Sequence, residues 1–296
     1  ANAAYTYDNR YSVTVSFRTD ASNFQAESVR DKFSPFWSFG ASWLISNEQF
    51  MEQETWVDQL KLCVSYGLAG IAAGKSGTSS VTTVEVHPGS LIYSGGESFN
   101  KIAERGNNTL TWEKSRTLNI GADVAFFGHK LSGSVEFYNK FSYDVLANTT
   151  VPVISQGVES MKLNNAEIVN RGVEFSISSN LPVVGDLSWN GTLNYSYNHN
   201  ELKKFGYTGP YMAVGNSYVE GRPIGSYSVL KPAGYSPEGY VMLEGKDGSL
   251  ETIMDYYSGH VMDFVTPQDG QTADDNNWAY YLGTTEPKST LSFSNM

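Results

Sequence analysis

The four histidines are the first candidates for metal binding or acid–base chemistry, and they are scattered along the chain. His87, His129, His199 and His260 fall in turns and loops and lack the spacing of a metal-ligating motif. No nucleophile elbow occurs. Residues 70–76 (GIAAGKS) are one residue short of a phosphate-binding loop and lead from a strand pattern into a long loop. We therefore predict no enzyme, no catalytic residue, no metal site and no cofactor.

Acidic loops offer a second kind of chemistry. Residues 269–277 (DGQTADDNN) and 246–248 (KDG) carry the hard oxygen ligands that Ca²⁺ prefers, but neither follows the EF-hand pattern. A glycosidase needs two carboxylates at a set separation, and with 31 acidic residues the chain offers many pairs, none singled out by its surroundings. Solvated loops are the favoured interpretation, and a glycoside hydrolase is the weakest function considered.

Aromatic residues gather in the same loop region, near Asp and Asn side chains. Flat rings with hydrogen-bonding neighbours suit sugar faces, but tyrosine-rich loops also suit the surface of a protein partner. The sequence does not separate these two interpretations. The candidates for ligand or partner binding are Tyr207, Tyr211, Tyr218, Tyr256, Tyr257, Trp278 and Tyr280.

Composition narrows the class of protein. The chain has 296 residues, of which 14% are aromatic and only 17% are charged, and it contains 28 glycines. Such a balance favours a β protein. The net charge of −11 argues against a nucleic-acid partner. The single Cys63 cannot form an internal disulfide, and its place in a strand pattern predicts a small packed side chain.

The elements that must position these residues are strands with strict alternation of apolar and polar side chains. In residues 11–18, Tyr11, Val13, Val15 and Phe17 share one face, while the other is polar. The same pattern recurs in residues 37–45, 60–68, 118–126, 131–137, 173–177, 187–197 and 291–293. We expect eight or nine antiparallel strands. The sequence contains no run of about eighteen apolar residues, the length that a transmembrane helix requires.

The connections between these strands are predicted to alternate between short and long. Short turns join residues 126–131 and 177–187, whereas their neighbours span residues 69–111, 141–171 and 198–287. Long connections at one end of the strands and short turns at the other end are typical of a transmembrane β-barrel with long extracellular loops. Tryptophans near strand ends fit the same class, because amphipathic rings favour the membrane–water interface. The predicted interfacial aromatics are Trp37, Trp43, Trp112 and Trp189.

Nine stretches in the right order resemble the SusC/RagA-like TonB-dependent transporters, with residues 110–139 the most specific. They are residues 10–18 (RYSVTVSFR), 33–46 (FSPFWSFGASWLIS), 60–67 (LKLCVSYG), 110–114 (LTWEK), 118–123 (LNIGAD), 131–139 (LSGSVEFYN), 170–175 (NRGVEF), 221–226 (GRPIGS) and 281–288 (YLGTTEPK).

This resemblance implies an architecture, a location and a set of partners. Residues 1–296 would form part of the barrel domain of a TonB-dependent receptor, internal or C-terminal, in a barrel of roughly twenty-two strands. No plug domain or TonB-contacting segment is expected within these residues. The implied location is the bacterial cell outer membrane. The implied partners are a SusD-like surface lipoprotein, TonB acting through a plug elsewhere, outer-membrane lipid, and a glycan or peptide substrate.

Two function classes therefore stand ahead of the hydrolase. The first is nutrient uptake, in which the segment lines a lumen carrying an oligosaccharide or a peptide. The second is a secreted β-sandwich that binds carbohydrate through the tyrosine-rich loops, because alternating strands also build sandwiches. A sandwich stays soluble without detergent, whereas an isolated barrel segment leaves open edges and an apolar face.

Overall fold

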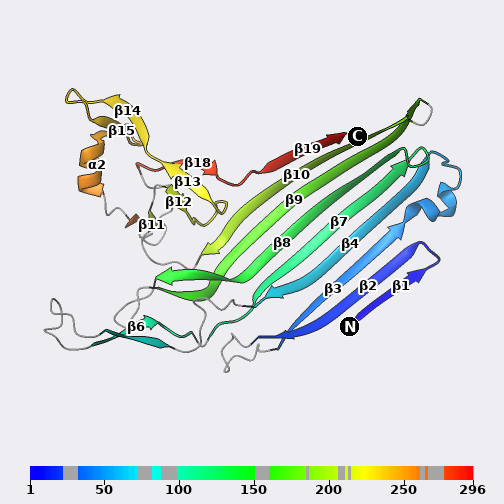
Figure 1. The fold of residues 1–296 in the computed structure, drawn as a ribbon, viewed down its shortest axis with the longest axis horizontal. Helices are drawn as coiled ribbons and strands as arrows, with labels where there is room; N and C mark the ends of the chain where they lie inside the picture. Colours follow the sequence, from blue (N-terminus) through cyan, green and yellow to red (C-terminus); the bar gives the residue numbers. More distant parts are fainter. Residues whose placement is uncertain are drawn as a thin grey trace.

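The computed structural model describes residues 1–22, 33–72, 82–87, 99–107, 109–150, 160–184, 187–205, 211–212, 215–260, 264–265 and 277–295. Its main element is one antiparallel sheet of nine strands, in the order β1-β2-β3-β4-β7-β8-β9-β10-β19 (Figure 1). These strands are β1 (Asn2–Tyr7), β2 (Tyr11–Ala21), β3 (Phe33–Leu44), β4 (Val57–Ile71), β7 (Glu113–Phe126), β8 (Leu131–Thr150), β9 (Ser160–Val184), β10 (Leu187–Phe205) and β19 (Ser289–Asn295). The predicted antiparallel sheet is confirmed, and β1 is a strand that the alternation did not identify.

The tight turns have the backbone geometry that their sequences favour. Asp8 and Asn9 both adopt positive φ values, 52° and 51°, between β1 and β2. Two successive positive φ values are the signature of a type I′ hairpin turn, which matches the twist of the strands it joins. Between β7 and β8, Gly128 has a φ of 70°, flanked by Phe127 and His129 with positive φ.

The two ends of the sheet differ in the length of their connections. At the end that we call the short-turn rim, residues 8–10, 45–56 and 127–130 join the strands, and β9 and β10 pair there as far as Val184 and Leu187. The opposite end, which we call the long-loop rim, carries the longer connections. Figure 1 shows the short-turn rim at the right and the long-loop rim at the left. The alternation is less strict than predicted, because residues 45–56 hold two 3-10 helices, η2 (Ile45–Asn47) and η3 (Gln49–Met51).

The predicted loop over residues 141–171 is mostly strand. β8 continues to Thr150, β9 begins at Ser160, and the two stay paired along this extension, with register shifts near Val145. Polar side chains lie on both faces here, so the apolar alternation that marks the rest of the strands is missing. The hairpin therefore extends past the apolar part of the sheet.

The remaining elements lie beyond the long-loop rim (Figure 1). They are β5 (Thr83–His87), β6 (Phe99–Glu104), β11 (Tyr211–Met212), β12 (Gly215–Ser217), β13 (Ser226–Val229), β14 (Lys231–Tyr235), β15 (Val241–Glu244), β16 (Leu250–Thr252), α2 (Ile253–His260), β17 (Phe264–Val265) and β18 (Tyr280–Thr284). Among the described residues, none of the helices has the length and apolar character required to span a membrane.

A segment with turn glycines ties this outer region to the main sheet. The backbone N–H of Gly221 donates to the carbonyl of Leu202 on β10 at 2.8 Å, and the Leu202 N–H donates to the carbonyl of Arg222 at 2.9 Å. The N–H of Ile224 donates to Oδ1 of Asn200 at 2.7 Å. Gly221 and Gly225 have φ values of 80° and 74°, a conformation that glycine adopts at little cost. Residues 221–226 thus fasten the outer loops to the end of β10.

Candidate functional site

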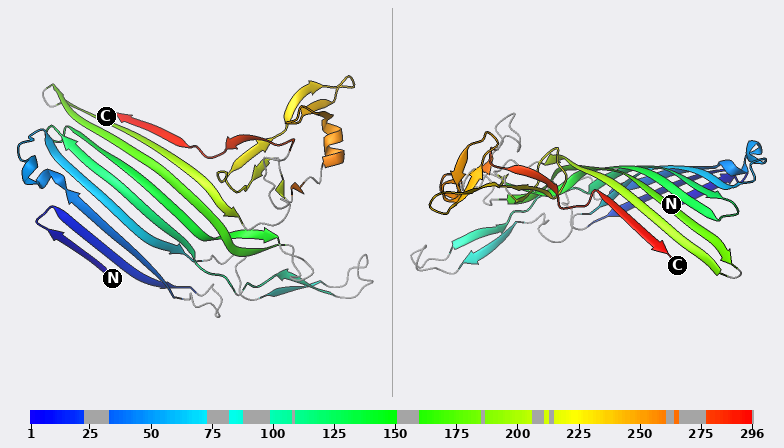
Figure 2. Two further views of the ribbon diagram at one scale, coloured as in Figure 1. Left: turned by 180° about the vertical axis from the view of Figure 1, so that it is seen from behind. Right: turned by 90° about the horizontal axis from the view of Figure 1, so that it is seen from above.

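One face of the nine-stranded sheet is apolar and uncovered. The pairing register places Val15, Phe39, Tyr66 and Leu118 in one row across β2, β3, β4 and β7. Although these are large apolar or aromatic residues, Val15 is 46% exposed and Phe39 is 45% exposed. Figure 2 shows the sheet from two further sides as a single twisted layer. An exposed apolar surface of this extent requires another apolar phase against it.

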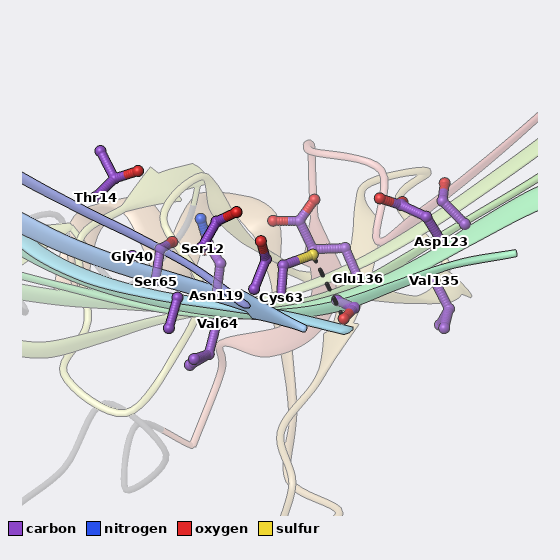
Figure 3. A pocket seen from close by; sticks show the side chains of 14 residues that line it. Ser12, Thr14, Gly40, Cys63, Val64, Ser65, Asn119, Asp123, Val135 and Glu136 are labelled. Atoms are coloured by element: carbon purple, nitrogen blue, oxygen red, sulfur yellow. Dashed lines mark hydrogen bonds between the residues drawn. The ribbon is translucent and has the colours of Figure 1, made fainter. Parts of the chain in front are cut away.

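The opposite face is polar and hollowed. One row contains Ser12, Ser42, Cys63, Gly121 and Glu136, on five adjacent strands. These residues line a hollow of about 320 Å³, and a second hollow of about 350 Å³ lies beside it over β8, β9 and β10. Figure 3 shows the side chains of Ser12, Cys63 and Glu136 on one side of the sheet and Val64 and Val135 on the other. The two faces of the sheet therefore differ sharply in polarity.

Two carboxylates lie side by side in the middle of this polar face. Glu136 on β8 and Glu174 on β9 are direct cross-strand partners, and Glu174 lines the second hollow with Glu136. Within the described residues, neither has a hydrogen bond or an ion pair. Like charges directly opposite each other destabilise a sheet. The pair therefore concentrates negative charge on the polar face.

Sequence reasoning did not identify this pair, although both residues lie in the quoted stretches 131–139 and 170–175. A local signal existed, since each glutamate alternates with the apolar positions of its strand. What was missing was the register that places the two side by side, and register depends on strand pairing rather than on local sequence.

Three of the four predicted interfacial tryptophans lie on the apolar face. Trp37, Trp43 and Trp189 are 41%, 36% and 38% exposed. Trp43 lies near the short-turn rim, where its Nε1 donates to Oε1 of Glu48 at 2.9 Å. Trp189 Nε1 donates to Oδ1 of Asn295 on β19 at 2.5 Å. All three remain candidates for interfacial anchors, and Trp43 and Trp189 combine an apolar ring with a hydrogen-bonded N–H.

Trp112 differs from that expectation, because it is only 4% exposed. Its ring packs edge-on against Phe36, with centroids 5.4 Å apart, and Phe36 alternates with the polar-face residues of β3. The preceding segment is clamped to β9, where Nδ2 of Asn164 donates to the carbonyl of Thr111 at 2.9 Å. Trp112 thus packs inside the long-loop rim instead of at an outer interface.

Glu48 closes the short-turn rim through three hydrogen bonds. It accepts from Tyr11 Oη at 2.5 Å, from Trp43 Nε1 at 2.9 Å and from Arg10 Nη1 at 3.0 Å. The bond from Tyr11 and then that from Trp43 lower the pKa of the Glu48 carboxyl below its ordinary value. One side chain thereby joins the β1–β2 turn, the start of β2 and the end of β3.

The aromatic residues predicted to bind a ligand or partner divide into a buried and an exposed group. Tyr256 and Trp278, 9% and 6% exposed, pack with Leu243 in a small core of the outer region. Tyr218 and Tyr257 are each 55% exposed. Tyr280 is partly exposed and pairs with Val229, and its ring lies 5.7 Å from Nζ of Lys231. Tyr211 pairs with Val265, and Tyr207 lies outside the described residues.

The acidic loop at residues 246–248 is a hydrogen-bonded turn. Oδ1 of Asp247 accepts from the backbone N–H of Ser249 and from Nδ2 of Asn277, both at 2.9 Å. Hydrogen bonds from the Ser249 hydroxyl, its backbone N–H and Asn277 lower the pKa of Asp247 to about 2. Most of residues 269–277 lies outside the described residues. In the described part of the chain, no group of three or more His, Cys, Asp or Glu side chains could hold a metal ion.

Comparisons with known proteins agree with this geometry. The family described as "TonB dependent receptor-like, beta-barrel" matches residues 1–240. TonB-dependent receptor P3 of Formosa agariphila is 31% identical over 203 residues, which cover 68% of this chain and 20% of that protein. TonB-dependent receptor SusC of Bacteroides thetaiotaomicron is 28% identical over 202 residues, again 68% of this chain and 20% of that protein.

Solved structures share the fold. The RagAB peptide importer in its open-open state superposes with a TM-score of 0.76 at 24% identity, covering 99% of this chain and 30% of that one. The RagAB peptide transporter gives a TM-score of 0.74 with 31% of its chain covered. The chain spans about a fifth of the length of the curated relatives it matches.

Proposed function

Because the chain belongs to the TonB-dependent receptor-like β-barrel family, we propose that its nine-stranded sheet forms part of the wall of a bacterial outer-membrane transporter that takes up nutrients. The observation that carries this proposal is the two-sided sheet, with an exposed apolar face toward lipid and a polar, hollowed face toward a lumen. β1 and β19 are the outer strands of the sheet. Further strands would pair with these edges and close the barrel, because an open edge exposes unpaired backbone groups.

The exposed apolar face of the sheet also disfavours the alternative function, a soluble β-sandwich. A sandwich covers the apolar face of each sheet with a second sheet about 10 Å away. The smaller sheets described here lie beyond the long-loop rim, and the apolar side chains of β2, β3 and β4 stay exposed. A membrane supplies the missing apolar phase.

The cargo proposed is an oligosaccharide or a peptide, moved through the lumen with energy supplied by TonB acting on a plug. The polar face offers hydroxyl and carboxylate groups to either class of ligand, and the Glu136–Glu174 pair favours a cationic group on the plug or on a peptide. Transport of this kind needs no catalytic residue in the wall. We assign none to this chain.

A SusD-like lipoprotein is the proposed partner at the long-loop rim. The exposed rings of Tyr218 and Tyr257, rather than the buried Tyr256 and Trp278, are the candidates for contact with such a lipoprotein or with the ligand. Alanine at each exposed tyrosine distinguishes the two roles. Loss of ligand binding with the lipoprotein still docked indicates a ligand site, and loss of docking indicates a partner surface.

Cys63 and Val64 provide a direct test, because they are neighbours on opposite faces of β4 (Figure 3). Cys63 is the only cysteine in residues 1–296. In the full-length protein, with any other cysteine replaced by serine, a spin label at Cys63 should be relaxed by a water-soluble nickel chelate. The same label at position 64, in a Cys63→Ser, Val64→Cys variant, should be relaxed by lipid-dissolved oxygen.

Equal access of the nickel chelate to both positions would contradict the lipid-facing assignment. Uptake is tested separately, by offering cells labelled oligosaccharides and labelled peptides with and without an intact TonB gene. Accumulation that does not depend on TonB would refute energised transport.

A further inference from the structure

A band of cationic and amide side chains follows the apolar band on the outward face. Along β7, β8, β9 and β10 the regular run of apolar outward positions is interrupted after Leu118, Phe137, Val173 and Tyr197, and on β8 and β9 it resumes one position later at Phe141 and Val169. The next outward position toward the long-loop rim is Arg116 on β7, Asn139 on β8, Arg171 on β9 and His199 on β10. Each of four neighbouring strands therefore carries one hydrogen-bonding side chain at the outer edge of the regular apolar band.

The two arginines of this band are exposed and are not neutralised. The guanidinium of Arg116 lies 4.9 Å from the centre of the Tyr143 ring, which orients it along the outward face. Arg171 is exposed and lies directly between Asn139 and His199 in the register. Among the described residues, neither arginine forms an ion pair with a carboxylate. Nearby lysines differ, since Lys203 Nζ lies 2.5 Å from Glu201 and Lys114 Nζ lies 3.4 Å from Asp144.

The short-turn rim has the opposite character. Its Arg10 is bound by two carboxylates, Asp8 at 3.1 Å and Glu48 at 3.0 Å. On the outward face there, apolar side chains reach the strand ends at Leu131 and Leu181, with Ser179 between them. Lys130 in the β7–β8 turn is also exposed, so the difference between the rims concerns the outward-facing arginines, in a chain whose net charge is −11. This difference between the rims favours contact with anionic groups outside the protein at the long-loop rim.

We propose that Arg116 and Arg171 form a docking surface for the phosphate groups of an anionic lipid in the outer leaflet. The inference rests on the proposed membrane location, which puts the apolar band in the lipid tails and the next residues at headgroup level. Arginine binds phosphate through two parallel N–H groups, and Asn139 adds a neutral donor between the two arginines. β7 and β9 are separated by one strand, roughly 10 Å, and the two arginines are offset by two residues, roughly 7 Å, along the strands, so one diphosphorylated headgroup can contact both through their long side chains.

The test uses the full-length transporter in detergent, stripped of lipid and titrated with diphosphorylated lipid A, with bound lipid counted by native mass spectrometry. Arg171→Gln and Arg116→Gln should each weaken binding severalfold, and the double variant by roughly tenfold or more. Lys203→Gln is the matched control, because it removes one cation that already has an acidic partner at the same rim. Its affinity should equal that of the wild type.

Three results overturn the inference: equal lipid A binding by wild type and the double variant, an equal loss in Lys203→Gln, or displacement of lipid A by inorganic phosphate in stoichiometric amounts. The last would identify a site for free anions. Failure of the proposed function appears differently, as a wild-type protein that does not assemble in the outer membrane. Variants that assemble and bind lipid A normally would overturn the lipid site alone.

Discussion

The ring of Tyr138 on β8 lies directly over Gly172 on β9, in the space that a side chain at position 172 would occupy. The two residues are cross-strand partners on the polar face. A Cβ atom at position 172 would collide with the Tyr138 ring and would lie 2.5 Å from the carbonyl oxygen of Tyr197. Gly172 therefore lets a large ring lie against the lumen wall, an arrangement known to support glycine in sheets.

Replacing Gly172 by alanine should destabilise the assembled barrel by about 1–3 kcal/mol, because ring and backbone must both move to admit a methyl group. The loss of stability can be measured on the full-length protein, either by its heat-induced unfolding followed by gel mobility or by its unfolding in urea. Gly40→Ala is the matched control on the same face, since the nearest atom to its Cβ lies at 3.9 Å. Equal stability of the two variants would show that the Tyr138 contact is unimportant.

Neutralising the carboxylate pair with Glu136→Gln and Glu174→Gln should reduce uptake without lowering the amount of assembled protein. The reason is that a cationic group inside the barrel loses its partner, while the sheet itself loses an unfavourable repulsion. Uptake rates normalised to protein in the outer-membrane fraction measure the effect. Glu238→Gln removes a charge from an exposed turn and should leave uptake unchanged, whereas full uptake by the double variant would argue against a cationic partner.

Removing Glu48 should loosen the short-turn rim. In Glu48→Ala, Arg10, Tyr11 and Trp43 lose a common acceptor, so unfolding in urea should occur at lower concentration. Glu54→Ala is the comparison, because the Glu54 carboxylate accepts one side-chain hydrogen bond in the described part of the chain, from Trp56 Nε1 at 2.7 Å. A smaller effect for Glu48→Ala than for Glu54→Ala would contradict the assigned role.

The Asp247 turn should keep its structure to unusually low pH. Its folded pKa of about 2 lies below the ordinary value of 3.8. The carboxylate therefore contributes its stabilisation fully above pH 3.8 and loses it as the pH falls toward 2. Hydrogen exchange at the Ser249 amide, corrected for intrinsic rates, should show constant protection from pH 7 to 4 and a decline below pH 3. Asp247→Ala should lack both this protection and its pH dependence.

The two adjacent tyrosines of α2 should respond differently to truncation. Tyr256 is part of the small core with Trp278 and Leu243, so Tyr256→Ala should destabilise the outer region by about 3 kcal/mol. Tyr257 is exposed, and Tyr257→Ala should preserve folding. Limited proteolysis of the assembled protein, with cuts mapped to residues 215–260, distinguishes them. Equal resistance in both variants would place Tyr256 outside the core.

Local sequence determined the strands wherever one face meets an apolar phase and the other meets water. Residues 11–18 and 118–126 alternate with period two, because successive strand side chains point to opposite faces. The same rule fails beyond the apolar band, where β8 and β9 mix apolar and polar side chains on both faces, so their extension to Thr150 and from Ser160 was not predicted. β1 was missed because alanine stands on both of its faces, at Ala3 and Ala4, which weakens the alternation.

The sequence by itself thus determined a two-faced antiparallel sheet, its asymmetric rims and its family. Only the tertiary structure decided which side chains meet: Glu136 beside Glu174, Tyr138 over Gly172, and Trp112 against Phe36 instead of at the outer interface. It also divided the loop tyrosines into core and surface. The physical reason is that alternation is a property of neighbours along the chain, whereas register and burial arise between strands that are distant in sequence.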